Sequence, residues 1–462
     1  MLFPASGRLS TLSRFVPACG PSGALYDITA FPTITSEGWF CSLQGTTSAG
    51  KRVNLKDAYM TRELSSRIRE QAEAIFSEVV GLRRDIHAHP ELSYEERRTT
   101  ALIRDYLVDL GITPEPAMLE TGVVALIRGG KSVPGSRLVA LRADIDALPL
   151  NEENGHGFCS QEPGKMHACG HDMHAAMLLG AANILSSLSD ELEGDVLLIF
   201  QPAEEKAPGG AKPLLDAGLF DRFKPSVVIG QHCFSTVEAG KVALCKGGFM
   251  AAADEFYITV NGQGGHASAP HRAADPVLAA AHIITAVQHL VSRVVPPGES
   301  AVVSISSIHG GNAPNVIPRQ VTMSGTMRSM NEQVRSLLHE KLRTTVTHVA
   351  EGLGVEASLE IMNGYPVLYN DPVVTDQASA ICSEYLGEEN VLACDPIMTA
   401  EDFAYFLQAC PGTFWQIGTG TKDQQKENTL HSPVFNPDEK ALLAGSGLLA
   451  YTAIRFLAGG KG

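Results

Sequence analysis

The chain has 462 residues, which is more than one compact hydrophobic core usually serves, so we expect two domains. Hydrophobic residues make up 44% and charged residues 19%, a composition typical of globular proteins with a large core. The net charge of −15 repels phosphate backbones and anionic lipid, which argues against nucleic acid and membrane partners. The net charge does not exclude a small anionic ligand, because a single arginine can bind one locally.

The first 56 residues differ in composition from the rest of the chain. They are rich in Ser, Gly, Thr and Pro, and no acidic residue precedes Asp27. Arg8 and Arg14 give the segment a slight organelle-targeting character. A disordered tail, or a start codon placed too early with Met60 nearer the true beginning, explains the same composition.

Nine cysteines are spread thinly along the chain, and no paired spacing repeats. In a chain of this length that pattern indicates reduced intracellular thiols. We therefore expect a cytoplasmic protein, with organelle targeting through residues 1–56 as the alternative. No uninterrupted apolar run reaches the roughly 18 residues of a membrane helix.

From about Leu64 onward, segments rich in Val, Ile and Leu alternate with helical stretches. This alternation predicts an α/β domain with a mixed, mainly parallel sheet flanked by helices. A helix is expected after His171, over Ala175–Leu188. The predicted strands are Gly122–Ile127, Arg137–Arg142, Asp195–Phe200 and Ser226–Gly230.

The pattern changes near Gly247 and returns to that of the large domain near Tyr365. Between them the order strand–helix–strand–strand–helix–strand predicts a smaller inserted α+β domain at 248–363, which leaves 57–247 and 364–462 for the larger one. The expected strands are Asp254–Asn261, Ala301–His309, Gln320–Arg328 and one near Leu359, and the expected helices are Pro276–Val294 and Asn331–Leu353.

Four polar clusters stand out in the larger domain, three of them directly after predicted strands. The clusters are Asp144 with Asp146, Glu204 with Glu205, Gln231 with His232, and the segment His167–Asp172. Ligands of open α/β sheets bind at the carboxyl ends of the strands, so these clusters can converge. Their His, Cys and carboxylate side chains are the ligands of zinc and neighbouring metals.

Each cluster also has a simpler interpretation. Cys169 and His171 flank Gly170 in a turn that can point both inward, but such a pair alone is more often a buried structural thiol. Two further histidines, His232 and His431, favour a metal. An adjacent acid pair is usually a solvated loop, yet the buried run before Glu204 favours one acid as ligand and its neighbour as proton acceptor.

Other polar residues admit both functional and structural roles. His87 and His89 either support the side chains of the site or have a purely structural role. His174 lies one turn beyond His171 on the same helix face, where it either packs in the core or supports a metal ligand. In the inserted domain His266 ends a Gly-rich turn that could equally be a surface hairpin. Asn312 and Asn315 could be simple turn formers. Arg328 ends a strand, where it is solvated or binds a substrate carboxylate.

Eight ordered motifs between Leu82 and Leu457 make the chain resemble the metal-dependent aminoacylases, hippurate hydrolases and auxin-conjugate hydrolases, relatives of the co-catalytic zinc carboxypeptidases. The motifs are Arg84–Leu92, Leu141–Pro149, Met166–Asp172, Gln201–Glu205, Gly264–Ala267, Asn315–Pro318, Glu401–Phe403 and Leu430–Pro433. Two features depart from the family pattern: Lys206-Ala207-Pro208 replaces a more Gly-rich continuation, and residues 1–56 have no counterpart.

The resemblance implies hydrolysis of N-acyl amino acids by a homodimer or higher homo-oligomer with two divalent ions, Zn²⁺ or Mn²⁺, per subunit. It implies Glu204 as general base, Asp146 as orienting residue and His266 reaching a neighbouring subunit's site. Arg328 or Asn315 would bind the substrate carboxylate. The implied metal ligands are Cys169, His171, Glu205, His232 and His431. A dipeptidase or an N-acetyl-diamino-acid deacetylase would use the same site, and a non-catalytic metal-binding relative would not need Glu204.

Overall fold

The computed structural model describes residues 27–35, 38–46, 52–421 and 429–459, with side chains described from Met60 onward. The chain divides into two compact units, Met1–Glu70 and Gln71–Gly462. The first unit contains an antiparallel sheet of three strands, which the sequence pattern did not predict, and the beginning of helix α1 (Leu55–Ala88). The strands are β1 (Asp27–Thr35), β2 (Gly38–Thr46) and β3 (Arg52–Asn54). The expectation of a disordered or targeting segment concerned residues 1–56, and its part over 1–26 lies outside the described residues.

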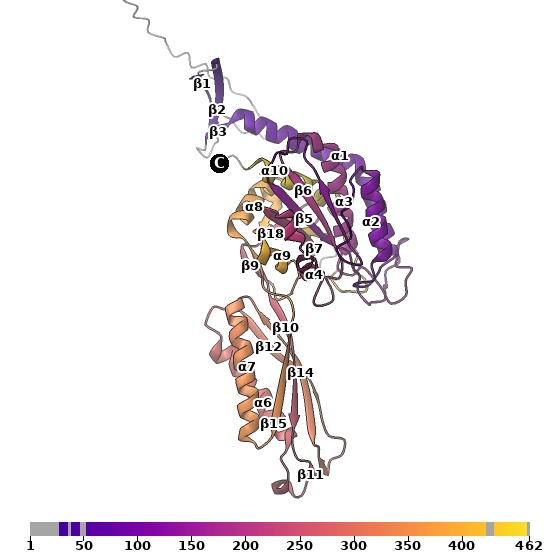
Figure 1. Ribbon diagram of the computed structural model, residues 1–462, viewed down its shortest axis with the longest axis vertical. Coiled ribbons are helices and arrows are strands. Elements are labelled where there is room, and N and C mark those ends of the chain that lie inside the picture. The colour runs from indigo at the N-terminus through magenta and orange to yellow at the C-terminus, as the bar shows by residue number, and fades with distance from the viewer. Residues whose placement is uncertain (1–26, 36–37, 47–51, 422–428, 460–462) are drawn as a thin grey trace, which may run out of the picture. The chain divides into compact units, whose positions relative to one another are not determined.

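The second unit contains a seven-stranded sheet in the order β17-β8-β18-β7-β5-β6-β4 (Figure 1). The neighbours from β18 to β6 are parallel, β4 and β8 run antiparallel to their inner neighbours, and β17 is parallel to β8. The strands are β4 (Val123–Ile127), β5 (Leu138–Asp144), β6 (Asp195–Gln201), β7 (Val227–Glu238), β8 (Val242–Leu244), β17 (Val391–Ala393) and β18 (Gly412–Gly420). The predicted mixed, mainly parallel sheet is therefore confirmed.

Helices cover both faces of this sheet, which explains the unbroken apolar runs in its central strands. On one face α3 (His171–Ser187) packs against α10 (Lys440–Ala458), and both helices are largely buried. On the other face, side chains of three short helices join the apolar cluster of the central strands. The remaining elements here are α2 (Arg97–Asp109), α4 (Ala211–Asp216), α5 (Leu219–Phe223), α8 (Pro372–Leu386), α9 (Ala404–Ala409), β9 (Gly247–Met250) and β16 (Leu368–Asn370).

The inserted domain is an antiparallel sheet in the order β12-β14-β10-β15 with two helices on one face (Figure 1). Its strands are β10 (Ala252–Asn261), β12 (Ala301–His309), β14 (Gln320–Ser329) and β15 (Glu356–Asn363), and its helices are α6 (Pro276–Val287) and α7 (Glu332–Gly352). A two-residue strand β11 (Gly265–His266) pairs with β13 (Val316–Ile317). This is the inserted α+β domain that the sequence predicted.

Two elements differ in extent from the prediction. Strand β7 does not end at Gly230 but continues to Glu238, because β18 keeps pairing with it over this length. Gln231 and His232 are polar but buried, so their polarity signalled a site rather than a strand end. The predicted helix over 276–294 divides into α6 and a π-helical turn at Leu290–Val294.

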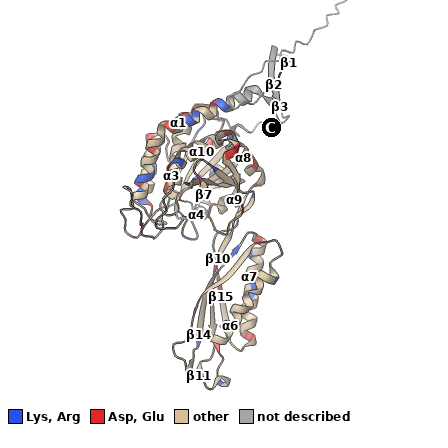
Figure 2. Cartoon of the chain, turned by 180° about the vertical axis from the view of Figure 1, so that it is seen from behind, with Lys and Arg blue, Asp and Glu red and all other residues tan. Residues whose placement is uncertain are grey.

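Two helices in the described part of the chain are long and apolar enough, by length and composition alone, to cross a membrane. They are Pro276–Val294 and Lys440–Ala458, with 28% and 72% of their apolar windows buried. The second is a core helix that packs against both the sheet and α3. Charged residues of both signs lie along α1 and α7 (Figure 2).

Candidate metal centre

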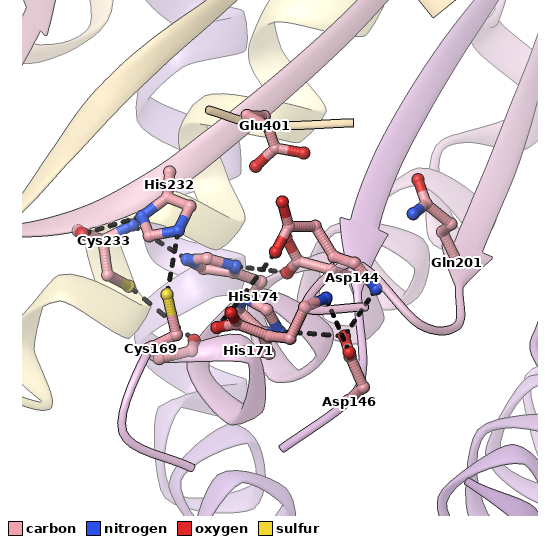
Figure 3. A network of polar contacts seen from close by, with 12 residues as sticks. Asp144, Asp146, Cys169, His171, His174, Gln201, His232, Cys233 and Glu401 are labelled. Carbon is pink, nitrogen blue, oxygen red and sulfur yellow. Dashed lines mark hydrogen bonds and ion pairs between the residues drawn. The ribbon is translucent and has the colours of Figure 1, made fainter. Parts of the chain in front are cut away.

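Five predicted donors converge beside the carboxyl ends of the central strands. Cys169 precedes α3, His171 begins it, His232 lies within β7, Glu205 follows β6 and His431 follows β18. Cys169 Sγ lies 3.4 Å from His232 Nε2 and 3.3 Å from His431 Nε2, and the latter lies 3.3 Å from Glu205 Oε1. Figure 3 shows Cys169, His171 and His232 converging while Asp146 lies against His171. Sulfur, imidazole nitrogen and carboxylate oxygen are the donors that zinc prefers.

The turn at Gly170 allows Cys169 and His171 to face the same point. Gly170 has φ 89°, in the left-handed region that favours glycine. A Cβ at this position would lie 3.0 Å from Cys233 Cβ, so a side chain is excluded by packing as well. Backbone conformation and packing therefore both require glycine between Cys169 and His171 at the start of α3.

Hydrogen bonds fix the two buried histidines in the tautomer that a metal requires. His171 Nδ1–H donates to Asp146 Oδ1 at 3.1 Å, and His232 Nδ1–H donates to the Cys233 carbonyl at 2.9 Å. Both Nε2 atoms therefore face the cluster, where a metal can bind them. His171 Nε2 is buried without a hydrogen-bond partner, as is Glu205 Oε1. The donor set thus fits a metal ion, which would satisfy both atoms.

His174 is close to the cluster, but its ring nitrogens are already occupied. Its Nδ1–H donates to Asp144 Oδ1 at 2.5 Å, and its Nε2 accepts the Cys233 backbone N–H at 2.8 Å. It therefore packs between β5 and β7 and does not belong to the donors.

The centre holds more acidic than fixed basic groups. Arg142 donates to Asp144, Glu401 and Asp402 at 2.7 to 2.9 Å. Burial and the neighbouring Glu401 raise the pKa of Glu204 well above its ordinary value. Burial also raises the pKa of Glu401 to about 8, although Arg142 opposes the shift. This surplus of buried carboxylates calls for a further cation.

Burial lowers the pKa of His171, but Asp144 and Asp146 outweigh it and raise the pKa to about 10. A bound divalent cation would compete with that proton for His171 Nε2.

The loop after β6 presents both acids of the pair to the centre. Asp146 accepts the backbone N–H groups of Glu204 and Glu205 at 3.0 and 2.9 Å. Ala203 has φ 58°, and its N–H donates to Glu96 at 2.8 Å. The departure from the family pattern at Lys206–Pro208 forms a turn in which Gly209 N–H donates to the Lys206 carbonyl at 2.9 Å.

Comparison with known proteins agrees with this fold and with a metal-binding centre. The model of Peptidase family M20/M25/M40 matches residues 140–455. The chain belongs to this family. It is 40% identical over 397 residues to thermostable carboxypeptidase 2 of Saccharolobus solfataricus, covering 85% of this chain and 99% of that one. It is 38% identical over 380 residues to N-acetyl-L-cysteine deacetylase of Bacillus subtilis, covering 82% and 88%.

A solved M20 structure supports the same conclusion. YXEP of Bacillus subtilis, described as a dinuclear metal binding peptidase of the M20 family, matches with a TM-score of 0.73 and 34% identity, covering 84% of this chain and 99% of that one. The family resemblance seen in the sequence is thus confirmed, and the chain is an M20 metallohydrolase.

A cavity of about 450 Å³ opens onto the M20 centre. Sequence reasoning assigned no role to several of its lining residues: Phe234, Met250, Tyr365, Thr399, Ala400, Glu401 and Leu430. Glu401 lies in a recognised motif, but its proximity to Glu204 depends on the fold. Tyr365 follows the inserted domain, and its hydroxyl donates to the Glu204 carbonyl at 2.5 Å. No local pattern marks Tyr365 as a site residue.

The three predicted site residues of the inserted domain, Arg328, His266 and Asn315, lie at two different ends of that domain. Arg328 lines the cavity and pairs with Ala253 at the start of β10. His266 and Asn315 lie together beyond the other end of β10, where Ala267 N–H donates to the Asn315 carbonyl at 3.0 Å. A ten-residue strand spans roughly 33 Å, so His266 and Asn315 do not join Arg328 within one chain.

Proposed function

We propose that this M20 metallohydrolase hydrolyses N-acyl amino acids to a carboxylic acid and a free amino acid. One observation carries the proposal: Arg328 lines the same cavity as the metal donors and the acidic pair. Within residues 60–421 and 429–459, the Arg328 guanidinium forms no ion pair. An unpaired guanidinium in a half-enclosed cavity suits the carboxylate of an amino acid.

The donors Cys169, His171, Glu205, His232 and His431 would hold two divalent ions, Zn²⁺ or Mn²⁺. When bound, the metal polarises the amide carbonyl and the attacking water. Glu204 takes a proton from the water and passes it to the leaving amine. Asp146 is a positioning residue, because it orients His171 and holds the backbone of the acidic pair.

The apolar part of the cavity lining suits the acyl group. Phe234, Met250 and Leu430 give this part of the lining an apolar surface. A carboxypeptidase or dipeptidase activity is the second candidate, supported by the carboxypeptidase relative. It would use the same Arg328 and differ in the group on the acyl side.

The test is amine release from a matched substrate panel: N-acetyl and N-benzoyl amino acids, their carboxamides, and dipeptides. We expect N-acyl amino acids to be turned over fastest, and each carboxamide to lose about 10²-fold in kcat/KM because it leaves Arg328 unpaired. Chelator should abolish turnover, and zinc or manganese should restore it. Faster turnover of dipeptides would favour the second candidate, and equal turnover of the carboxamides would contradict the role of Arg328.

A further inference from the structure

A second group of metal-binding side chains lies where the end of α1 meets the loop between β5 and α3. Glu152 Oε1 is 3.2 Å from His87 Nε2 and 3.2 Å from His156 Nε2. The three donor atoms lie within 4.8 Å of one another. None of these residues lines the M20 cavity or belongs to its five donors. The group is therefore separate from the metal centre.

The His87 ring is fixed with one nitrogen facing Glu152. Its Nδ1–H donates to Asp172 Oδ2 at 2.8 Å, and Arg83 Nε lies 2.7 Å from the same oxygen. A carboxylate that accepts from one nitrogen of a histidine sets the tautomer and increases the basicity of the other, as beside protein-bound zinc. His87 Nε2 thus has the orientation of a metal ligand.

His156 presents its Nε2 atom to the same point. Its ring stacks on Phe158 with a centroid distance of 3.8 Å, and its Nδ1 lies 3.4 Å from Cys159 Sγ. Its Nε2 is buried and lies 3.2 Å from Glu152 Oε1, but it forms no hydrogen bond. An unpartnered ring nitrogen beside a carboxylate oxygen and a second imidazole is a free donor for a cation.

The distances from Glu152 Oε1 to the two ring nitrogens also suit zinc. With ligand bonds of about 2.0 to 2.1 Å in tetrahedral geometry, neighbouring donors lie about 3.3 Å apart. Both distances to Glu152 Oε1 are close to this value. Two histidines and one carboxylate leave a fourth position for water, and entry is from the side of His156, whose side chain is 16% exposed.

We propose that His87, Glu152 and His156 bind a zinc ion that is separate from the M20 metal centre. The ion connects the loop that carries Glu152 and His156 to the end of α1. Without it, a proton on His87 Nε2 is shared with Glu152. With it, the ion replaces this proton and satisfies His156 Nε2.

The test counts zinc on the full chain by elemental analysis after zinc loading and gel filtration, and measures affinity by equilibrium dialysis with zinc alone. His156→Phe keeps the stacking on Phe158 and removes both nitrogens. We expect it to hold one zinc fewer per chain than the wild type, or to bind that zinc at least about 10-fold more weakly. His156→Gln should lose zinc to the same extent, and it replaces His156→Phe in the test if that variant does not fold.

The matched control is His89→Gln, at the same end of α1. His89 Nδ1 faces the Asp85 carbonyl at 2.8 Å and lies outside the group, so this variant should keep the full zinc content. Hydrolysis at saturating metal should be unchanged in His156→Phe, since the M20 donors are intact. The proposal is overturned if folded His156→Phe and wild type bind equal zinc with equal affinity. It is also overturned if the lost zinc takes the hydrolytic activity with it.

Discussion

Glu204 and Glu205 are adjacent in the chain, but their carboxylates have different surroundings. Glu205 Oε1 lies 3.3 Å from His431 Nε2 and 3.9 Å from His171 Nε2, among the donors. Glu204 is buried beside Glu401, and no donor histidine forms an ion pair with it in the described part of the chain. The Glu204 carboxylate also lies within 4.8 Å of a His171 ring nitrogen. We therefore propose, on these contacts, that Glu205 binds metal and Glu204 transfers protons.

Substitution of the pair should separate these roles. Glu204→Gln should keep its metal and lose roughly 10²-fold or more in kcat, the usual scale for loss of a general base. Glu205→Gln should lose metal as well, because one donor of the cluster is neutralised. Metal content by elemental analysis and kcat at saturating metal measure both effects. If Glu204→Gln lost metal and Glu205→Gln kept it, the roles of the two residues would be reversed.

Arg328 should act on substrate binding more than on the chemical step. Arg328→Ala should reduce kcat/KM for N-acyl amino acids by about 10²-fold, mainly through KM, because it removes a charge-assisted contact to the carboxylate. The carboxamide substrates, which lack that charge, should be affected far less. Arg293→Ala, an exposed arginine of the same domain, is the control. A loss of equal size for both substrate classes would contradict carboxylate binding by Arg328.

The convergence of Cys169, His171, Glu205 and His232 could be predicted from the sequence, because each lies next to an element that the pattern also predicts. His431 was indicated by its short motif alone. Cys169 and His171 share one turn, and Glu205 follows a buried strand. Tyr365 and Glu401 could not be given roles, because their place in the cavity depends on how distant segments meet. Local sequence thus indicates the donors but not the rest of the lining.

Among the elements, α3 and α10 approach closely through small residues. A Cβ at Gly445 of α10 would lie 2.0 Å from Met177 Sδ of α3 and 3.0 Å from Gln231 Nε2. Gly81 in α1 is exposed, with nothing within 4 Å of the same position. Packing therefore opposes a larger side chain at Gly445 but not at Gly81.

Two glycine substitutions should therefore change stability in opposite directions. Gly445→Ala should destabilise the protein by about 1 to 3 kcal/mol through overpacking. Gly81→Ala should stabilise it by about 0.5 to 1 kcal/mol, since alanine is the better helix former. Calorimetric Tm values measure both. A stabilised Gly445→Ala variant would show that α3 and α10 have room between them.

Asp254 of β10 connects the inserted domain to its returning linker. Its carboxylate accepts from Arg335 at 2.5 and 2.9 Å, from His339 at 2.6 Å and from Gly364 N–H at 3.0 Å. Burial raises the pKa of Asp254, but these donors outweigh it and lower the pKa to about 2. The ionised form is therefore favoured by folding.

The sign of this shift predicts an acid-dependent loss of stability. A depressed pKa stabilises the fold above the unfolded value of about 3.9, and the contribution is lost as pH falls through about 2. Asp254→Asn should cost about 2 to 3 kcal/mol at pH 7 and flatten the fall in Tm between pH 4 and 2. The exposed neighbour Glu255→Gln is the control. An unchanged acid profile in Asp254→Asn would exclude this linkage.

Element prediction succeeded where the chain shows one clear periodicity and failed where it does not. The alternating pattern of β10 and the apolar run of β6 predicted those strands. The end of β7 was missed because buried polar residues continue the strand, and α6 ends early in a π-helical turn. The strands over 27–54 lie in a segment whose composition suggested no regular structure.

At the scale of the whole molecule, the change of pattern near Gly247 predicted an inserted domain, but it could not show which of that domain's residues reach the cavity. Arg328 does, and His266 does not. The sheet of the inserted domain ends in β12 and β15, each hydrogen-bonded to a single neighbouring strand. Val277 and Leu278 of α6 are 44% and 51% exposed. An unpaired strand edge and exposed apolar side chains suit a twofold contact with a second copy.

If the chain forms such a dimer, His266 of one subunit can complete the site of the other, and subunit mixing tests this directly. His266→Ala and Glu204→Gln should each be inactive alone. After dissociation and reassociation together, a mixed dimer has one site that lacks both groups and one intact site, so about half of its sites should regain activity. His271→Ala, on the turn after His266, should stay active and is the control. No recovery in demonstrated mixed dimers would exclude a shared site, because a site contained within one chain stays inactive whichever partner it receives.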